Sequence, residues 1–132
     1  MGRSAVETLR EHGVNPSAQR VAVADYVLQT DEHPSADQVW TRVQQTFPHI
    51  SRATVYNTLR LFVEKGLLRQ YAITEGCVVF DPNVAPHHHI IDEETGAIHD
   101  VPWDAVDIGK PPKVRGFEVR EYQVVMRGRK KR

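Results

Sequence analysis

The stretch Ser51-Arg-Ala-Thr-Val-Tyr-Asn-Thr-Leu-Arg60 has the pattern of a helix with one apolar and one polar face. Ser51 can cap the helix, because a serine hydroxyl accepts a hydrogen bond from a free backbone N–H of the first turn. Val55, Leu59 and Phe62 recur at the spacing that places side chains on one helical face. The stretch therefore predicts a helix that is buried along one side and exposed along the other.

Three shorter helices are predicted before this one, each opened by a serine that can cap it. These serines are Ser4, Ser17 and Ser35. After Gly66, residues 67–73 and 77–80 are β-type runs joined by a turn at 74–76. Four helices followed by a hairpin is the order of a winged helix, in which the third and fourth helices form a helix-turn-helix with residues 48–50 in the turn.

The polar face of the fourth helix offers side chains that can read DNA. Arginine pairs with guanine edges, asparagine with adenine, and tyrosine and threonine can contact phosphates or a thymine methyl group. The candidate DNA contacts on this helix are Ser51, Arg52, Thr54, Tyr56, Asn57 and Arg60. Arg20 and Arg69 are candidate backbone contacts from the second helix and the hairpin. A helix whose polar face is only solvated would show the same periodicity.

The second half of the chain predicts a small separate domain. Residues 81–86 contain two prolines and resemble a linker. Beyond it we expect a hairpin formed by residues 89–91 and 97–101, and a third strand at 117–126. About 45 residues make a core too thin to stand alone, which favours burial against a second copy of the chain.

The expected fold class is therefore α+β. A winged helix-turn-helix domain at 1–81 is followed by a hinge at 82–86 and by a small α/β dimerisation domain at 87–132.

A histidine cluster lies in an acidic region without basic residues. From Asp81 to Gly109 there are seven acidic residues, four histidines and no lysine or arginine. Alternate residues of a strand share a face, so His87 and His89 should point the same way. Asp81 and Asp100 could complete a cation site of the kind that suits iron(II), manganese(II) or zinc(II) rather than copper(I). The alternative is a surface histidine cluster that binds no metal.

Composition excludes several classes of protein. The formal net charge is zero, so overall charge does not point to a nucleic-acid partner. The single cysteine, Cys77, allows no internal disulfide and no four-thiolate zinc site. The apolar runs are too short for a transmembrane helix, and the N-terminal residues are polar rather than signal-like. We expect a cytoplasmic protein without a membrane partner.

Six motifs occur in the order and spacing of the ferric uptake regulator family, over nearly the whole chain. They are Gln19-Arg20, His33-Pro-Ser-Ala36, Ser51-Arg-Ala-Thr-Val-Tyr56, Glu64-Lys-Gly-Leu-Leu68, Phe80-Asp81 and His87-His-His89. The resemblance implies a homodimeric transcriptional repressor, not an enzyme, that binds a double-stranded DNA operator.

The resemblance also implies the ligands of a regulatory metal. Carried over position by position, they are His33, Asp81, His87, His89 and Asp100. One ion held from both sides of the hinge would fix the angle between the domains, and two recognition helices must meet the major groove about one helical turn apart. A ligand that favours this arrangement shifts the population towards DNA binding.

Two branches of the family are similar to this chain. Asp100 and Asn57 resemble the peroxide-sensing branch, which implies iron(II) or manganese(II), with zinc(II) possible in vitro, and oxidation at His33 or His87. Asn83, residues 87–89 and residues 124–132 resemble the iron-response regulators, which implies iron or haem as the signal. Cys77 precedes valine rather than the proline of that branch's haem motif, so haem binding is left open only at the histidine cluster.

The chain departs from the family at two sites. The structural zinc site with two Cys-x-x-Cys pairs is absent, since the first pair falls on Asp92 and Thr95. A second family metal site would use His88 and Asp107, but its later histidine falls near Tyr122. A remote alternative is a small non-haem metalloenzyme with two histidines and one carboxylate, although it would have no use for the exposed polar face of a helix-turn-helix.

Overall fold

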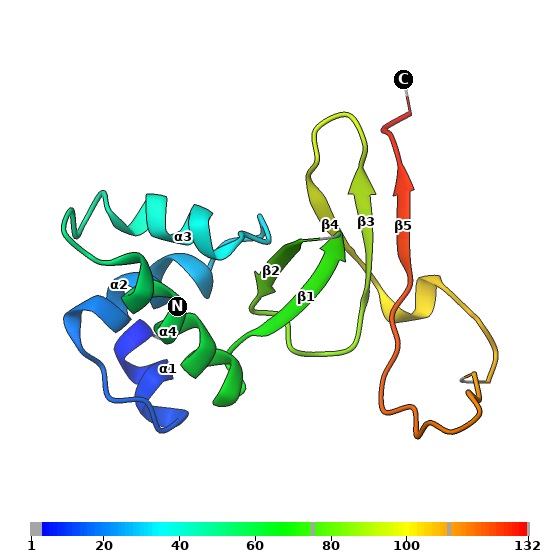
Figure 1. Cartoon of the computed structure of the whole chain (residues 1–132), viewed down its shortest axis with the longest axis horizontal. Helices are drawn as coiled ribbons and strands as arrows, with labels where there is room; N and C mark the ends of the chain where they lie inside the picture. Colours follow the sequence, from blue (N-terminus) through cyan, green and yellow to red (C-terminus); the bar gives the residue numbers. More distant parts are fainter. Residues whose placement is uncertain (1–3, 75, 111, 132) are drawn as a thin grey trace. The chain divides into compact units, whose positions relative to one another are not determined.

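The computed structural model describes residues 4–74, 76–110 and 112–131 (Figure 1). The chain divides into two compact units, Met1–Val84 and Ala85–Arg132. The first unit contains α1 (Ala5–Glu11), α2 (Ala18–Val27), α3 (Ala36–Val43), α4 (Arg52–Glu64), β1 (Arg69–Thr74) and β2 (Cys77–Asp81). The second unit contains β3 (His88–Asp92), β4 (Ile98–Val101), the short 3-10 helix η1 (Trp103–Ala105) and β5 (Val125–Gly128). None of the described helices is long and apolar enough to cross a membrane.

Serine caps fix where the four helices begin, as the sequence predicts. Each of Ser4, Ser17, Ser35 and Ser51 accepts a hydrogen bond on its side chain from the backbone N–H three residues later. At α3 the cap is reciprocal, because the Gln38 side chain accepts from the backbone N–H of Ser35 at 2.8 Å. The predicted order of four helices followed by a hairpin is confirmed.

The core of the first unit forms where α4 packs against the other helices. Val55, Leu59 and Phe62 are completely buried, together with Leu9 and Val39. The turn between α3 and α4 is fixed by the Trp40 indole N–H, which donates to the carbonyl of Ile50 at 3.0 Å. Helices α3 and α4 thus form the predicted helix-turn-helix, and the face of α4 opposite the core remains exposed.

The hairpin β1–β2 is joined to the start of α3 by main-chain contacts. The strands pair antiparallel, with Arg69 opposite Asp81. The backbone N–H of Phe80 donates to the carbonyl of Pro34 at 2.9 Å, and Ser35 forms an isolated bridge with Val79. These contacts bring the loop before α3 to the end of β2.

The second unit is a three-stranded sheet in the order β4-β3-β5. Strands β3 and β4 form the predicted hairpin, with His89 opposite Asp100, and β5 runs parallel to β3 (Figure 1). The turn between β3 and β4 is closed by the Gly96 N–H, which donates to the carbonyl of Asp92 at 2.7 Å.

The third strand lies later in the chain than its sequence pattern predicts. We expected it at 117–126, but β5 spans Val125–Gly128 and only its first two residues overlap. The pairing of β3 with β5 runs over four positions, from His89 opposite Val125 to Asp92 opposite Gly128. The alternating residues before β5 belong instead to the connection that leads from β4 to the other edge of β3, where Phe117 is 76% exposed.

Replacing Leu59 by alanine should lower the free energy of unfolding by about 2–5 kcal/mol, because the buried side chain would leave a cavity in the first unit. Chemical denaturation measures the change. Asn57→Ala on the exposed face of the same helix is the control and should stay within about 0.5 kcal/mol of the parent. Equal effects of the two substitutions would contradict the proposed core face of α4.

Candidate functional site

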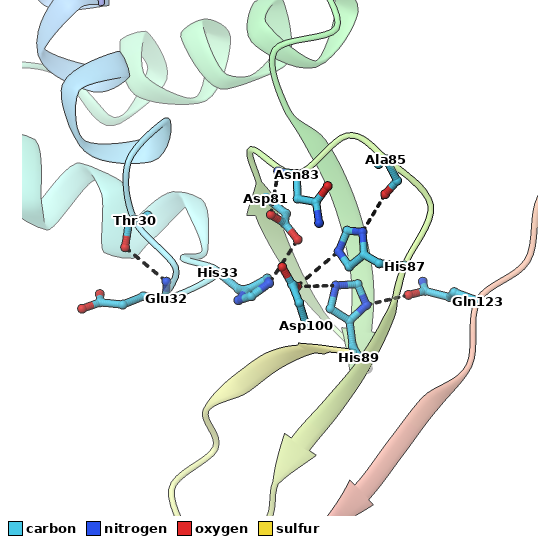
Figure 2. Close-up of polar contacts among 10 residues, drawn as sticks. All are labelled: Thr30, Glu32, His33, Asp81, Asn83, Ala85, His87, His89, Asp100 and Gln123. Atoms are coloured by element: carbon cyan, nitrogen blue, oxygen red, sulfur yellow. Dashed lines mark hydrogen bonds and ion pairs between the residues drawn. The ribbon is translucent and has the colours of Figure 1, made fainter. Parts of the chain in front are cut away.

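A buried histidine–aspartate pair lies in the first unit at the end of β2. His33 Nε2 is 3.1 Å from Asp81 Oδ2, and both side chains are 4% exposed (Figure 2). His33 belongs to the loop before α3, in which the Glu32 N–H donates to the Thr30 hydroxyl at 3.2 Å. The bond between Phe80 and Pro34 places the loop beside β2 and so brings the imidazole to the carboxylate.

The backbone of His33 is held in the left-handed region. Its φ is 55°, and among the described residues it is the only one other than glycine with a positive φ. Such a conformation costs about 1–2 kcal/mol for a residue with a side chain. Strain of this kind persists where the surrounding contacts enforce it and is concentrated at functional sites.

Two imidazoles and one carboxylate meet in the second unit. His87 Nε2 and His89 Nε2 lie 3.2 Å and 3.5 Å from the same oxygen, Asp100 Oδ1 (Figure 2). The register of β3 and β4 produces this arrangement, because His89 is paired with Asp100. The centroids of the two histidine rings are 4.6 Å apart. Both rings are buried, whereas the Asp100 side chain is 39% exposed. The shared face predicted for His87 and His89 is confirmed.

The hydrogen bonding of His87 indicates that this group suits a cation. His87 Nδ1 is 2.7 Å from the carbonyl oxygen of Ala85, which can only accept, so Nδ1 carries the donated proton. In a neutral ring, Nε2 then presents a lone pair to Asp100 Oδ1. A cation placed between the two atoms would be attracted by both, and imidazole with carboxylate is a ligand set for iron(II), manganese(II) or zinc(II).

His88 faces away from this group and packs against aromatic rings. Its ring stacks on Trp103, with centroids 4.5 Å apart and an interplanar angle of 11°. His88 Nδ1 accepts a hydrogen bond from the backbone N–H of Val124 at 2.9 Å. Asp107 accepts from the N–H of Gly109 within its own loop at 2.7 Å. The sequence predicts a second metal site that uses His88 and Asp107, but neither of these interactions joins the two residues.

The polar face of α4 carries an arginine and a tyrosine that share one acceptor. The Tyr56 hydroxyl donates to Asp37 Oδ1 at 3.2 Å, and Arg52 Nε lies 3.4 Å from the same oxygen. The Arg52 guanidinium also lies over the Trp40 ring, 4.8 Å from its centroid. Asp37 on α3 therefore orders both side chains on the exposed face of α4.

The other candidate DNA contacts fall into separate groups. Asn57 and Arg60 are exposed on α4, whereas the Ser51 and Thr54 hydroxyls lie 2.7 Å apart at its N-terminus. Away from α4, the Arg20 side chain donates to the carbonyl of Asn15 at 3.0 Å, and Arg69 lies over the Tyr71 ring.

Sequence reasoning missed two polar residues that organise these groups, Asp37 and Gln123. Asp37 is an ordinary acidic residue in the first turn of α3, and only the packing of α3 on α4 reveals its partners. Gln123 Oε1 lies 2.9 Å from His89 Nδ1 (Figure 2). Gln123 falls in the region predicted as a strand. No spacing in the sequence links it to His89, which lies far earlier in the chain.

The fold and these groups define a class: a two-unit helix-turn-helix protein with a histidine–carboxylate group suited to a divalent cation. A model of the ferric uptake regulator family matches residues 11–127. The peroxide operon regulator of Bacillus subtilis strain 168 is 34% identical over 96% of this chain and 88% of its own. The peroxide-responsive repressor PerR of Staphylococcus epidermidis is 35% identical over 78% of this chain and 69% of its own. The chain belongs to the ferric uptake regulator family.

Solved structures agree with this assignment. PerR from Streptococcus pyogenes, in a structure that concerns peroxide sensing and gene regulation, is 31% identical over 94% of this chain and 86% of its own, with a TM-score of 0.54. The match to the structure of the ferric uptake regulator of Pseudomonas aeruginosa with manganese covers 98% of this chain and 100% of that protein's chain, with a TM-score of 0.69. Its identity is 24%, so this second likeness supports the fold alone.

Replacing Asp37 by asparagine should lower the pKa of Tyr56 towards its ordinary value. That pKa is raised by desolvation, then by the hydrogen bond to Asp37 and by its negative charge, and the substitution removes the charge. NMR-detected pH titration of the tyrosine rings measures the shift. Tyr26, whose raised pKa comes from burial and from Glu32, is the internal control. An unchanged Tyr56 pKa would show that Asp37 does not order this face.

Proposed function

We infer that the protein is a metal-dependent, DNA-binding transcriptional repressor that responds to peroxide. The observation that carries this proposal is the pair of buried imidazoles directed at one oxygen of Asp100. The relatives named for peroxide response support peroxide as the signal, in preference to iron or haem. In this proposal peroxide is sensed at the metal site, and the response is the release of DNA by α4.

One divalent ion takes its ligands from both units. The first unit offers His33 and Asp81, and the second offers His87, His89 and Asp100. Two carboxylates balance the charge of one divalent cation, and neutral imidazoles complete the shell without adding charge. The ligands of one unit fill only part of the coordination shell. An ion that takes ligands from both units is therefore bound more tightly than an ion held by one unit alone. Iron(II) and manganese(II) are the physiological candidates, and zinc(II) is a competitor in vitro.

Residues 82–86 form the hinge between a DNA-binding domain at 1–81 and a dimerisation and metal-sensing domain at 87–132. Residues 83–86 are exposed and belong to no helix or strand, and the boundary between the two compact units falls within the hinge. An ion held from both sides restricts this hinge. In a dimer, the restriction sets the spacing of the two α4 helices, which must match about one turn of DNA.

A second copy of the chain completes the second unit. The connection between η1 and β5 exposes Ile108, Val114, Phe117 and Val119, which is more apolar surface than a unit of this size can leave in water at no cost. The single cysteine, Cys77, lies on β2 in the first unit, so no four-cysteine zinc site braces the sheet. Apolar packing between two copies therefore holds the dimer.

DNA binding uses the exposed face of α4. Arg52 and Tyr56 are ordered by Asp37, while Asn57 and Arg60 point to solvent and are available for base edges. The N-terminus of α4, with Ser51 and Thr54, favours a DNA phosphate. Arg20 on α2 and Arg69 on the β1–β2 hairpin contact the DNA backbone.

Peroxide acts through the histidine ligands. Iron(II), when bound, supplies the reducing chemistry that splits peroxide next to the imidazoles. The O–O bond of the peroxide would break, one oxygen would be inserted into a ring C–H bond of His33 or His87, and the other would leave as water, so that the two-electron oxidation of the ring balances the reduction of the peroxide. An oxidised His33 or His87 would be a poorer ligand, so it would no longer help to hold the hinge, and the affinity for the operator would fall.

Manganese(II) should be required for tight binding to an operator. The operator is obtained by selecting a random duplex library with manganese-loaded protein, and gel shifts are then run with and without manganese. Asp100→Asn should weaken manganese binding by more than about 100-fold, because even outer-shell changes cost 10–100-fold. Asp104→Asn, an exposed aspartate in the same unit, is the matched control and should behave as the parent. Equal operator binding by both variants with and without metal would refute the proposal.

Iron-loaded protein treated with peroxide should gain one oxygen atom on a peptide that contains His33 or His87. The oxidation requires a reduced, redox-active ion at the ligands, so manganese-loaded protein should remain unmodified. Peptide mass spectrometry locates the added oxygen, and the gel shift should disappear in parallel. Oxidation at equal levels with both metals, or only at methionine, would leave a metal-responsive repressor without a peroxide response.

A further inference from the structure

The Gln123 side chain reaches a metal-ligand candidate of the second unit from the segment before β5. Its Oε1 atom lies 2.9 Å from His89 Nδ1, and the His89 ring is completely buried (Figure 2). The opposite nitrogen of the ring, Nε2, faces Asp100 Oδ1 at 3.5 Å. One end of the imidazole is therefore turned towards the cation group and the other towards Gln123.

A neutral imidazole carries one N–H, so the partner of one nitrogen decides the state of the other. Binding of a cation through Nε2 requires the proton to sit on Nδ1. The amide oxygen of Gln123 can only accept a hydrogen bond, and it therefore favours this form of His89. With the amide reversed, its NH₂ group would donate to Nδ1, and the ring proton would move to Nε2 and block the metal.

The backbone around Gln123 is fastened to β3 on both sides. The N–H of Val124 donates to His88 Nδ1 at 2.9 Å, and the N–H of His89 donates to the carbonyl of Val124 at 3.1 Å. On the other side, the Tyr122 ring lies 6.5 Å from the His88 ring of β3 and 4.9 Å from the Trp103 ring of η1, centroid to centroid. Gln123 is thus presented to His89 by a segment that is itself held in place by His88.

His87 provides an internal reference, because its proton is fixed in a different way. Its Nδ1 atom donates to the main-chain carbonyl of Ala85, which no side-chain substitution removes. For His89 the equivalent acceptor is a side chain. The second unit therefore contains one imidazole whose form is set by the backbone and one whose form depends on residue 123.

We propose that Gln123 is a positioning residue that holds the Nδ1–H form of His89, so that Nε2 is ready for a divalent cation. The inference rests on the proposed function in that it takes His89 as a ligand. It goes further by naming the residue that tunes the affinity of the site. Acceptors behind histidine ligands commonly change metal affinity by 10–100-fold.

The first test uses metal-free protein and does not depend on metal binding. Long-range ¹H–¹⁵N NMR spectra of the histidine rings distinguish Nδ1–H from Nε2–H. In the parent protein both His87 and His89 should carry Nδ1–H. In Gln123→Leu, which keeps the size of the side chain but has no acceptor, His89 should change to Nε2–H while His87 does not. Gln123→Glu keeps an acceptor and should retain Nδ1–H at both rings.

The second test is titration of each protein with manganese(II) alone. Gln123→Leu should bind about 10–100-fold more weakly than the parent, and Gln123→Glu should bind at least as tightly. Gln44→Leu makes the same chemical change at a half-buried glutamine of the first unit and should match the parent in both tests. Thermal unfolding of each variant confirms that it is folded, and Gln123→Glu keeps the test valid should the leucine variant unfold.

The outcomes separate this inference from the proposed function. An Nε2–H form of His89 in the parent, or an unchanged form and unchanged affinity in Gln123→Leu, overturns the role of Gln123 while the parent still binds manganese. Failure of the parent to bind manganese overturns the proposed function, whatever form His89 takes in the metal-free spectra.

Discussion

The hydrogen bonding of β3 along both of its edges is the constraint on which the second unit depends. On one edge the antiparallel register with β4 places Asp100 opposite His89. On the other edge β5 runs parallel, and the residues that lead into it bring Gln123 to the back of the same ring. A shift of one residue in either pairing would turn the side chains to the opposite face and separate the histidines from their partners.

In the first unit the equivalent constraint is the bond between the Phe80 N–H and the Pro34 carbonyl. It ties the hairpin to the start of α3, directly after the residue that precedes the proline. That residue is His33, and its left-handed backbone carries a cost that the core of the unit must offset. A glycine would adopt the same backbone without strain but would have no imidazole to offer Asp81. The presence of histidine at a position suited to glycine argues that the ring has a function there.

The sequence predicts the parts of this protein that depend on local rules. Four serine caps locate the helices, because each cap satisfies a backbone N–H within the first turn. The alternation of β3 separates His88 from His87 and His89, because it follows from the geometry of one strand. The sequence does not predict the extent of β5, since residues 117–126 alternate as a strand would, whereas pairing with β3 begins only at Val125. Asp37 and Gln123 also escape prediction, because their partners lie on other elements and no local spacing marks them.

His88 and His89 are neighbours in sequence with opposite environments, because one packs against aromatic rings and the other faces Asp100 in the candidate cation group. His88 stacks on Trp103 and accepts from Val124, so it contributes to the packing that fastens the segment before β5. His89 faces the carboxylate and depends on that fastened segment for its orientation. The second unit contains no cysteine, and the stack of His88 on Trp103 is one of the contacts that order the segment before β5. Such order bears on the proposed cation site, because the partner of its second nitrogen fixes the orientation of a histidine ligand.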